Sequence, residues 1–253
     1  MHPILFKLGP ITVYTYGVFV FLGVLAGYLF CLEQAKKESI DTKVFSDILF
    51  WSIISGFLGA RLFYIVIEFK QFMDDPIGIG LGRAGFVFYG GIIFGLPVFY
   101  FLARKHRLDF LNLTDLVILA LPLAHAIGRI GCFFYGCCYG KPTDSWIGMK
   151  FAPDSPAGLL GVKIIPTQII SSLFLFLIFF LLLTLRKTRK FKGQIFLYYI
   201  IVYSIFRFII EFYRGDPRGY LGSLSFSQVI SLILIGGALI LWPCLKCRDK
   251  LKV

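Results

Sequence analysis

Charged residues are scarce in this chain of 253 residues: they make up 16% of the sequence, and Asp and Glu together number 14. A soluble domain ordinarily carries about a quarter charged residues, so this composition excludes a cytosolic globular protein. Cysteine and histidine are also scarce, with six and three residues scattered along the chain. These numbers exclude a disulfide framework and an obvious zinc module.

Hydrophobic residues are abundant instead: they make up 58% of the chain, and the mean hydropathy is +0.81. The chain is therefore expected to be a membrane protein. Lys and Arg number 26 and the formal net charge is +12, which in a soluble chain would suggest a nucleic-acid partner. Here the cations flank apolar segments, so membrane topology explains them and no nucleic-acid partner is expected.

Seven hydrophobic ranges are long enough to cross a bilayer as helices, each of which needs roughly 20 residues. They are 11–32, 48–67, 84–103, 116–136, 164–185, 193–213 and 221–245. Seven helices of roughly 20 residues use about 140 positions, which leaves room only for short loops. The sequence predicts an all-α polytopic membrane protein with seven transmembrane helices in a single integral membrane domain over 1–253.

The distribution of Lys and Arg predicts the orientation of these helices. Basic residues cluster in the loops after the first, third and fifth ranges and after the last. Because such loops stay in the cytoplasm, the N-terminus is expected outside and the C-terminus in the cytoplasm. The longest external loop, 137–163, contains Gly, Pro and Asp and is the expected substrate-facing cap.

Three arginines lie inside predicted spans, at Arg61, Arg129 and Arg207. At 1.5 Å per helical residue they lie about 9 to 10 Å from the external ends, and Tyr16 and Tyr89 lie about 8 Å from theirs. A charge at the bilayer centre costs about 2.5 to 3.5 kcal/mol and less near the interface. The three arginines are therefore expected to face a polar cavity in the outer leaflet.

The positive charge in this leaflet exceeds the negative charge. Glu211 follows Arg207 by four residues and can neutralise only one guanidinium group. Arginine binds phosphate through a planar fork and stays charged when it is buried. The surplus charge therefore fits a phosphate, and an outer-leaflet phospholipid head group is the nearest source. The candidate phosphate ligands are Arg61, Arg129, Arg207 and Arg214.

Simpler interpretations stand beside this one. Arg207 and Glu211 could form only a helix-stabilising ion pair, Arg214 could be a snorkelling anchor, and Arg61 could reach a head group at the interface. Arg129 differs because Gly128 and Gly131 flank it, which allows close backbone approach or a broken helix at membrane depth. That combination indicates a binding site.

Several short motifs are spread along the chain: Tyr16-Gly17, Gly59-Ala60-Arg61, Tyr89-Gly90-Gly91, Gly128-Arg129-Ile130-Gly131, and Arg207, Glu211 and Arg214 within 207–214. Together they resemble the prolipoprotein diacylglyceryl transferase family over nearly the whole chain. The resemblance implies a bacterial inner-membrane enzyme that moves a diacylglyceryl group from phosphatidylglycerol to the lipobox cysteine at a signal-peptide junction of preprolipoproteins. A thioether forms and glycerol phosphate is released. By the same resemblance Arg129 and Arg207 would hold the phosphate, and Tyr16 would be an essential site residue.

The chain departs from the family pattern at a few positions. Cys132 stands where the family has Asn after its Gly-Arg-x-Gly, Tyr89 stands where the best-known members have a histidine, and 165–168 lacks the family's His. These departures fit a divergent subfamily or a paralogue with another acceptor. A noncatalytic lipid-binding or lipid-transporting protein is the alternative from another class.

The departures also leave the general base open. Transfer to sulfur needs a thiolate, and a free thiol has a pKa near 8.5. His125 lies one turn before Arg129. A histidine side chain has an unperturbed pKa near 6.5, which suits a general base at neutral pH. Tyr89 as a phenolate stabilised by arginines, Glu211, or the positive cavity acting alone are the other candidates.

Five of the six cysteines form two small groups. Cys132, Cys137 and Cys138 are expected first as packing residues, next as a disulfide that pins the loop, and last as metal ligands. Cys244 and Cys247 form a lone C-x-x-C, which is weak evidence for metal or redox work. The sequence predicts no cofactor and no metal.

Overall fold

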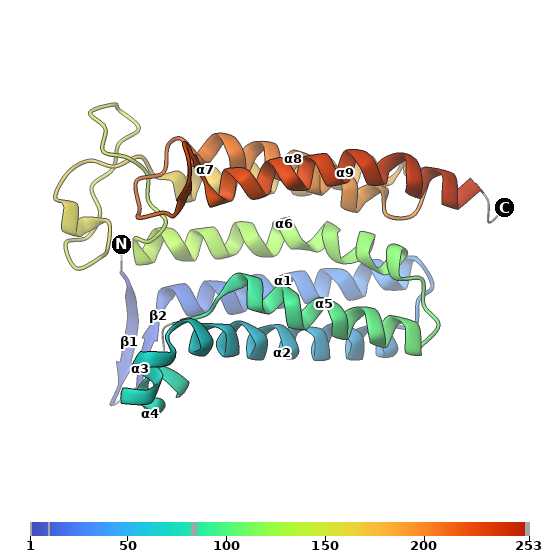
Figure 1. The fold of residues 1–253 in the computed structure, drawn as a ribbon, viewed down its shortest axis with the longest axis horizontal. Helices are drawn as coiled ribbons and strands as arrows, with labels where there is room; N and C mark the ends of the chain where they lie inside the picture. The colour runs from blue at the N-terminus through green and yellow to red at the C-terminus, as the bar shows by residue number, and fades with distance from the viewer. Residues whose placement is uncertain (1, 10, 82–84, 251–253) are drawn as a thin grey trace. The chain divides into compact units, whose positions relative to one another are not determined.

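The computed structural model describes residues 2–9, 11–81 and 85–250. Within these residues, seven helices of 18 or more residues overlap the seven predicted ranges (Figure 1). They are α1 (Thr15–Lys37), α2 (Thr42–Ile67), α5 (Phe88–Lys105), α6 (Phe110–Tyr135), α7 (Thr167–Arg186), α8 (Gln194–Glu211) and α9 (Phe226–Lys250). The short elements are α3 (Phe69–Asp74), α4 (Pro76–Leu81) and a 3-10 turn, Gly158–Leu160. Ala84, the predicted start of the third span, lies outside the described residues.

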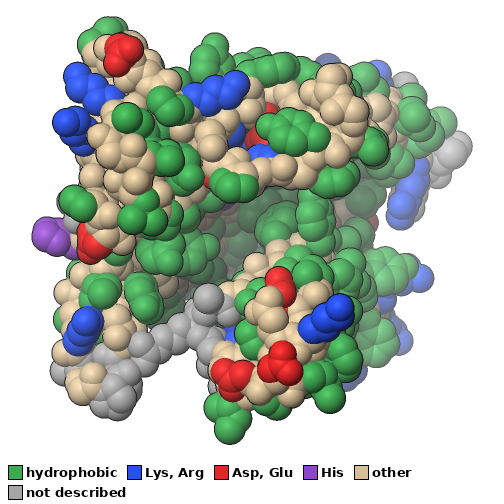
Figure 2. All heavy atoms as spheres, turned by 60° about the vertical axis from the view of Figure 1, so that its left-hand side comes forward, with side chains coloured by type: hydrophobic (Ala, Val, Ile, Leu, Met, Phe, Trp, Pro, Cys, Tyr) green, Lys and Arg blue, Asp and Glu red, His purple; other side chains and the backbone are tan. Residues whose placement is uncertain are grey.

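Six of the described helices are long and apolar enough to cross a membrane: α1, α2, α6, α7, α8 and α9. Their outward faces carry large hydrophobic side chains, such as Phe21, Leu177 and Ile240, which are 64%, 65% and 70% exposed. Hydrophobic side chains also make up much of the surface in Figure 2. Because such a surface needs lipid rather than water around it, the chain is a mostly helical, multi-pass membrane protein.

Two of the predicted spans begin with a β-hairpin strand rather than with helix. Residues 11–14 form strand β2 (Ile11–Tyr14), which pairs with β1 (Ile4–Leu8), so the first helix begins at Thr15. The last predicted range likewise begins in a small hairpin, β3 (Tyr220–Leu221) and β4 (Leu224–Ser225). An uncharged run does not by itself specify helix, and the β-branched and aromatic residues of 11–14 favour strand.

The chain divides into two compact units, each of which is described by itself: Met1–Cys31 with Thr114–Val253, and Leu32–Leu113. The second unit is held by close packing of α2 on α5. A Cβ atom on Gly59 would lie 2.6 Å from the carbonyl oxygen of Gly90, and one on Gly90 would lie 2.5 Å from that of Gly59. Only glycine allows this approach. The single domain predicted over 1–253 stays a prediction.

The first unit contains the corresponding contact between α1 and α6. A Cβ atom on Gly23 would lie 2.6 Å from the carbonyl oxygen of Ala124, and one on Gly131 would lie 2.8 Å from Cβ of Phe19. Helix α6 runs without a break past Gly131 to Tyr135. These contacts bring the start of α1 against the end of α6.

A buried carboxylate positions the start of α8 in the same unit. Asp115 is 1% exposed, and it accepts hydrogen bonds from the backbone N–H groups of Gly193 (2.8 Å) and Phe196 (2.9 Å). It also forms an ion pair with Arg189 at 3.3 Å. Because the first N–H groups of a helix lack partners within it, this carboxylate acts as the N-terminal cap of α8.

Candidate active site

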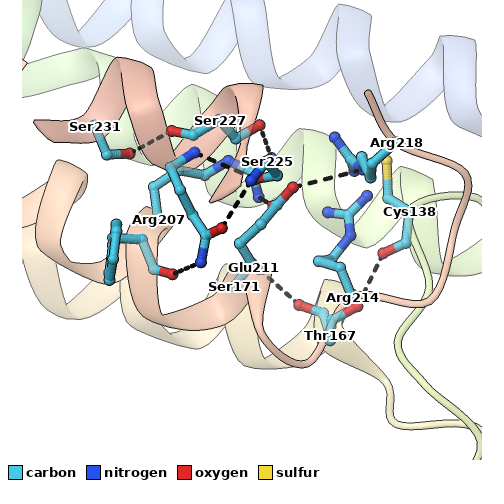
Figure 3. A network of polar contacts seen from close by, with 12 residues as sticks. Cys138, Thr167, Ser171, Arg207, Glu211, Arg214, Arg218, Ser225, Ser227 and Ser231 are labelled. Carbon is cyan, nitrogen blue, oxygen red and sulfur yellow. Dashed lines mark hydrogen bonds and ion pairs between the residues drawn. The ribbon is translucent and has the colours of Figure 1, made fainter. Parts of the chain in front are cut away.

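The first turn of α9 supplies a hydroxyl group to the site. Ser225 and Gln228 cap this helix reciprocally: the Ser225 N–H donates to Oε1 of Gln228 (2.9 Å), and the Gln228 N–H donates to Oγ of Ser225 (3.3 Å). This capping box fixes the first turn. Ser227 lies in that turn and accepts a hydrogen bond from Nη2 of Arg207 on α8 at 2.8 Å (Figure 3).

Arg207 also forms an ion pair one turn along its own helix. Its Nη1 lies 2.8 Å from Oε2 of Glu211, and the two side chains are 15% and 3% exposed. The other oxygen of Glu211 lies 3.8 Å from Nε of Arg218. The buried carboxylate of Glu211 therefore lies near two guanidinium groups, and its single negative charge cannot neutralise both.

The loop after α8 holds a second charged group. Arg214 donates two hydrogen bonds of 2.8 Å to the two oxygens of Asp216, and Arg218 donates one of 2.9 Å to the same carboxylate. The Arg214 side chain is 2% exposed. Burial alone would lower its pKa, but the hydrogen bonds from Arg214 to Asp216 outweigh burial and raise that pKa. Arg214 is thus a buried, charged residue, and the alternative of a snorkelling anchor is not supported.

The end of α6 contributes Arg129 and His125. The Arg129 Nε–H donates to Nε2 of His125 at 3.1 Å, and Tyr203 on α8 is a further side-chain hydrogen-bond partner of Arg129. The rings of His125 and Tyr203 meet edge to face, with centroids 5.5 Å apart. Because Nε2 of His125 accepts this hydrogen bond, the lone pair of that nitrogen is not free to take a proton from a substrate.

Arg129, Arg207 and Arg214 are near enough to interact electrostatically with one another. The structure therefore brings together three of the four arginines that the sequence predicted for phosphate binding. With Arg218, three guanidinium groups share the carboxylates of Glu211 and Asp216, and Arg129 adds a fourth guanidinium group that pairs with neither. The arrangement carries surplus positive charge and is suited to an anion.

Tyr16 lies at the start of α1 in the same unit. It is 42% exposed, its ring lies 6.2 Å from that of Tyr135, and it interacts electrostatically with Arg129. Gly131 packs against the backbone of Tyr16, whereas a Cβ atom on Gly128 would meet nothing within 4 Å. Of these two glycines, only Gly131 is at a close helix contact.

The remaining predicted site residues belong to the second unit. Arg61 donates to the carbonyl oxygens of Gly85 (3.0 Å) and Ile79, and its guanidinium carbon lies 5.5 Å from the ring centroid of Phe86. Tyr89 is half exposed in the first turn of α5, followed by Gly90 and Gly91 at the contact with α2. The structure places these residues relative to one another and not relative to Arg129.

The three cysteines after Arg129 gather at a tight turn. Gly136 and Cys138 have left-handed backbone conformations, with φ of 79° and 61°. The Sγ atoms of Cys132, Cys137 and Cys138 lie within 4.8 Å of one another, and all three cysteines are free. Hydrogen bonds from the other two thiols, together with the positive charges of Arg129 and Arg214, lower the pKa of Cys138.

Sequence reasoning missed four polar residues of the site: Tyr203, Asp216, Arg218 and Ser227. The charges of 214–218 follow one another within five positions, and Ser225-x-x-Gln228 is a capping-box pattern that predicts a helix start. Tyr203 precedes Arg207 by four residues and so lies on the same helix face. These signals were present in the sequence, although they do not show which partners meet.

Comparison with known proteins gives a consistent result. The family model described as prolipoprotein diacylglyceryl transferase matches residues 3–244. The protein named phosphatidylglycerol–prolipoprotein diacylglyceryl transferase from Clostridium tetani is 44% identical over 237 residues, which are 93% of this chain and 94% of the relative. A Clostridium perfringens protein of that name, numbered 2, is 41% identical over 252 residues, which are 99% of this chain and 98% of the relative. The one from Finegoldia magna is 36% identical over 244 residues, which are 95% of this chain and 94% of the relative. The chain therefore belongs to the prolipoprotein diacylglyceryl transferase family.

Proposed function

We propose that this protein transfers the diacylglyceryl group of phosphatidylglycerol to the lipobox cysteine of prolipoproteins. The product is a thioether, the leaving group is glycerol phosphate, and the reaction is the first step of lipoprotein maturation. Membership of the family and the substrates named for its relatives support this proposal. The observation that carries it within the structure is the group of mutually interacting arginines, Arg129, Arg207 and Arg214.

The arginines match the charge that develops in this reaction. The acceptor sulfur bonds to the glyceryl carbon while the C–O bond from that carbon to the phosphate breaks, and the bonding electrons leave with the phosphate oxygen. The phosphate gains one negative charge in this step. Guanidinium groups already in position stabilise that charge. Ser227 and Glu211 hold Arg207, and His125 and Tyr203 hold Arg129.

The four predicted catalytic residues have different surroundings. Glu211 is occupied by cations and His125 accepts from Arg129, so both are better suited to positioning arginines than to taking a proton. Tyr16 is half exposed beside Arg129, where its hydroxyl can contact a bound lipid. Tyr89 and Arg61 stay candidates for substrate contact from the second unit, with Gly90 and Gly91; Gly128 and Gly131 stay candidates for close backbone approach beside Arg129.

The topology that suits this reaction has seven spans, an outside N-terminus and a cytoplasmic C-terminus. The seventh span is α5, an 18-residue helix whose last turn holds Arg104 and Lys105. In this topology the arginines lie in the outer leaflet of the bacterial inner membrane, and 137–163 is external. The signal-peptide region of the preprolipoprotein would meet the site there. The basic residues serve topology and lipid binding rather than a nucleic acid.

A lipidation assay tests the proposed function. Purified protein is mixed with phosphatidylglycerol labelled in its acyl chains and a lipobox peptide, and a peptide with Ser in place of the lipobox Cys is the control. We expect the label on the Cys peptide alone, with stoichiometric release of glycerol phosphate. Bound lipid with an intact peptide, from a preparation shown to be folded, would instead support a noncatalytic lipid-binding protein.

A further inference from the structure

The turn after α6 gathers three sulfur atoms in a space that suits one metal ion. The Sγ atoms of Cys132, Cys137 and Cys138 all lie within 4.8 Å of one another. In a tetrahedral zinc site with Zn–S bonds of about 2.3 Å, sulfur ligands lie about 3.8 Å apart. Small side-chain rotations close that difference.

The surrounding structure holds this turn in place. The side chains of Thr167 and Gln168, both buried in the first turn of α7, donate to the carbonyl oxygens of Cys138 (2.9 Å) and Cys137 (2.8 Å). Cys138 has a φ of 61°, a left-handed conformation that non-glycine residues seldom adopt. Such a conformation persists where the surroundings enforce it, and here it brings the third thiol to the other two.

The charges near the turn favour a thiolate cluster over simple packing. Arg129 and Arg214 both interact electrostatically with Cys138 (Figure 3 shows Cys138 and Arg214). Three thiolates with one divalent cation carry a net charge of about −1, which these guanidinium groups stabilise. Thiolate ligands select Zn²⁺ or Cu⁺ among the common metals, and the tetrahedral preference of Zn²⁺ leaves one further position.

We propose that Cys132, Cys137 and Cys138 bind Zn²⁺, and that the fourth zinc ligand is the acceptor thiol of the prolipoprotein. The second part rests on the proposed function. Cys132 is buried but Cys137 and Cys138 are partly exposed, so an external ligand can reach the cluster. Zinc sites with three protein ligands keep such an open position. Tyr16 interacts electrostatically with all three cysteines and with Arg129, so the cysteine cluster and one of the arginines proposed to bind phosphate share this neighbour.

The site supplies the thiolate that the reaction needs. When the acceptor thiol binds Zn²⁺ it gives up its proton to solvent, because a thiol coordinated to zinc is deprotonated. The zinc-bound sulfur then bonds to the glyceryl carbon, the C–O bond to phosphate breaks, and the electron pair leaves with glycerol phosphate. The thioether is a weaker ligand than the thiolate and dissociates from the metal. This route needs no side chain as a general base. It therefore agrees with the hydrogen bond that His125 accepts from Arg129, which occupies the lone pair of Nε2.

Metal analysis tests the binding site directly. Wild-type protein is purified under reducing conditions, incubated with Zn²⁺ alone, freed of loosely bound metal by gel filtration, and analysed by mass spectrometry of the elements. We expect about one zinc per chain. Cys132→Ser and Cys138→Ser should each lose most of it, whereas the double variant Cys244→Ser and Cys247→Ser, at two exposed positions outside the cluster, should retain it. Folded wild-type protein without bound zinc, or with a disulfide among the three cysteines, would overturn the proposal.

Cobalt substitution tests the fourth ligand. The Co²⁺ protein should show sulfur-to-cobalt charge-transfer absorption, which increases when a lipobox peptide is added and stays unchanged with the Ser peptide. Chelation of the wild-type enzyme should lower the initial lipidation rate about a hundredfold, with recovery on adding Zn²⁺. Full activity without metal would refute the role of zinc in activating the acceptor thiol and leave the proposed function standing. Zinc binding and the spectral change without any thioether would support the site and refute the proposed function.

Discussion

Arg129 has uncharged partners, His125 and Tyr203, whereas Arg207 and Arg214 each pair with a carboxylate. A bound phosphate can therefore pair with the guanidinium group of Arg129 without displacing a carboxylate. Hydrogen bonding through Nε fixes the plane of the guanidinium group, so its two terminal nitrogens can be presented together. At the scale of single residues, Arg129 is the best placed phosphate ligand of the site.

The Arg129→Lys variant should lose phosphatidylglycerol turnover by about a hundredfold to a thousandfold, because an ammonium group cannot reproduce a bidentate fork aimed at the developing charge. The measurement is kcat and kcat/KM for lipidation, with Arg104→Lys, a change at an exposed helix end, as the matched control. Near-normal turnover of Arg129→Lys would remove Arg129 from the proposed role.

A pair of variants at His125 separates positioning from proton transfer. Gln at this position can still accept the hydrogen bond from Arg129, whereas Leu cannot. We expect His125→Gln to keep its rate within about tenfold and its pH profile unchanged, and His125→Leu to lose about a hundredfold. Rates across pH 5 to 9 provide the measurement. If His125→Gln loses the ionisation near neutral pH that limits the wild-type rate, His125 is the base.

The helices of the first unit depend on polar residues placed at their ends. Asp115 on α6 caps α8 from outside that helix, and the Ser225–Gln228 box caps α9. Asp115 acts at the end of α8 remote from Arg207, whereas the Ser225–Gln228 box fixes the turn that holds Ser227 against Arg207. The site is thus positioned by helix ends as well as by helix packing.

Replacing Asp115 by Asn should destabilise the first unit by about 2 to 4 kcal/mol, because Asn has one acceptor oxygen for two backbone N–H groups and leaves Arg189 without its buried partner. Thermal unfolding in detergent, followed by circular dichroism, measures the change, and Asp144→Asn, at an exposed position in the 137–163 loop, is the control. Equal unfolding temperatures for the two variants would show that the cap contributes little.

The helices were predictable because hydrophobic runs of about 20 residues have few alternatives in a membrane. The hairpins at 4–14 and 220–225 were not, since hydropathy does not separate strand from helix. In the site, Arg129 and Arg207 stood out as charges inside apolar runs. The pairing of Arg214 with Asp216 and the contact of Arg207 with Ser227 depend on the folded loop, and spacing along the chain could not show them.

On the scale of the whole molecule, basic residues lie in the last turns of three of the long helices. Lys36 and Lys37 lie in the last turn of α1, Arg104 and Lys105 in that of α5, and Arg186 in that of α7. If all three ends face the cytoplasm, the positive-inside rule is satisfied throughout. That condition requires α5 to cross the membrane between α2 and α6.

Cysteine accessibility decides between seven spans and six. Three spans, α2, α5 and α6, separate Lys36 from Ser145 in the seven-span topology, so the two positions lie on opposite sides of the membrane. If α5 did not cross, they would lie on the same side. Lys36→Cys and Ser145→Cys are introduced singly, in a background with Cys244→Ser and Cys247→Ser, and treated with a membrane-impermeant thiol reagent in spheroplasts. The label that this background takes up by itself, at the partly exposed Cys137 and Cys138, is measured separately and subtracted. We expect labelling at Ser145→Cys in intact spheroplasts, and at Lys36→Cys only after permeabilisation; labelling of both before permeabilisation would refute the seven-span topology.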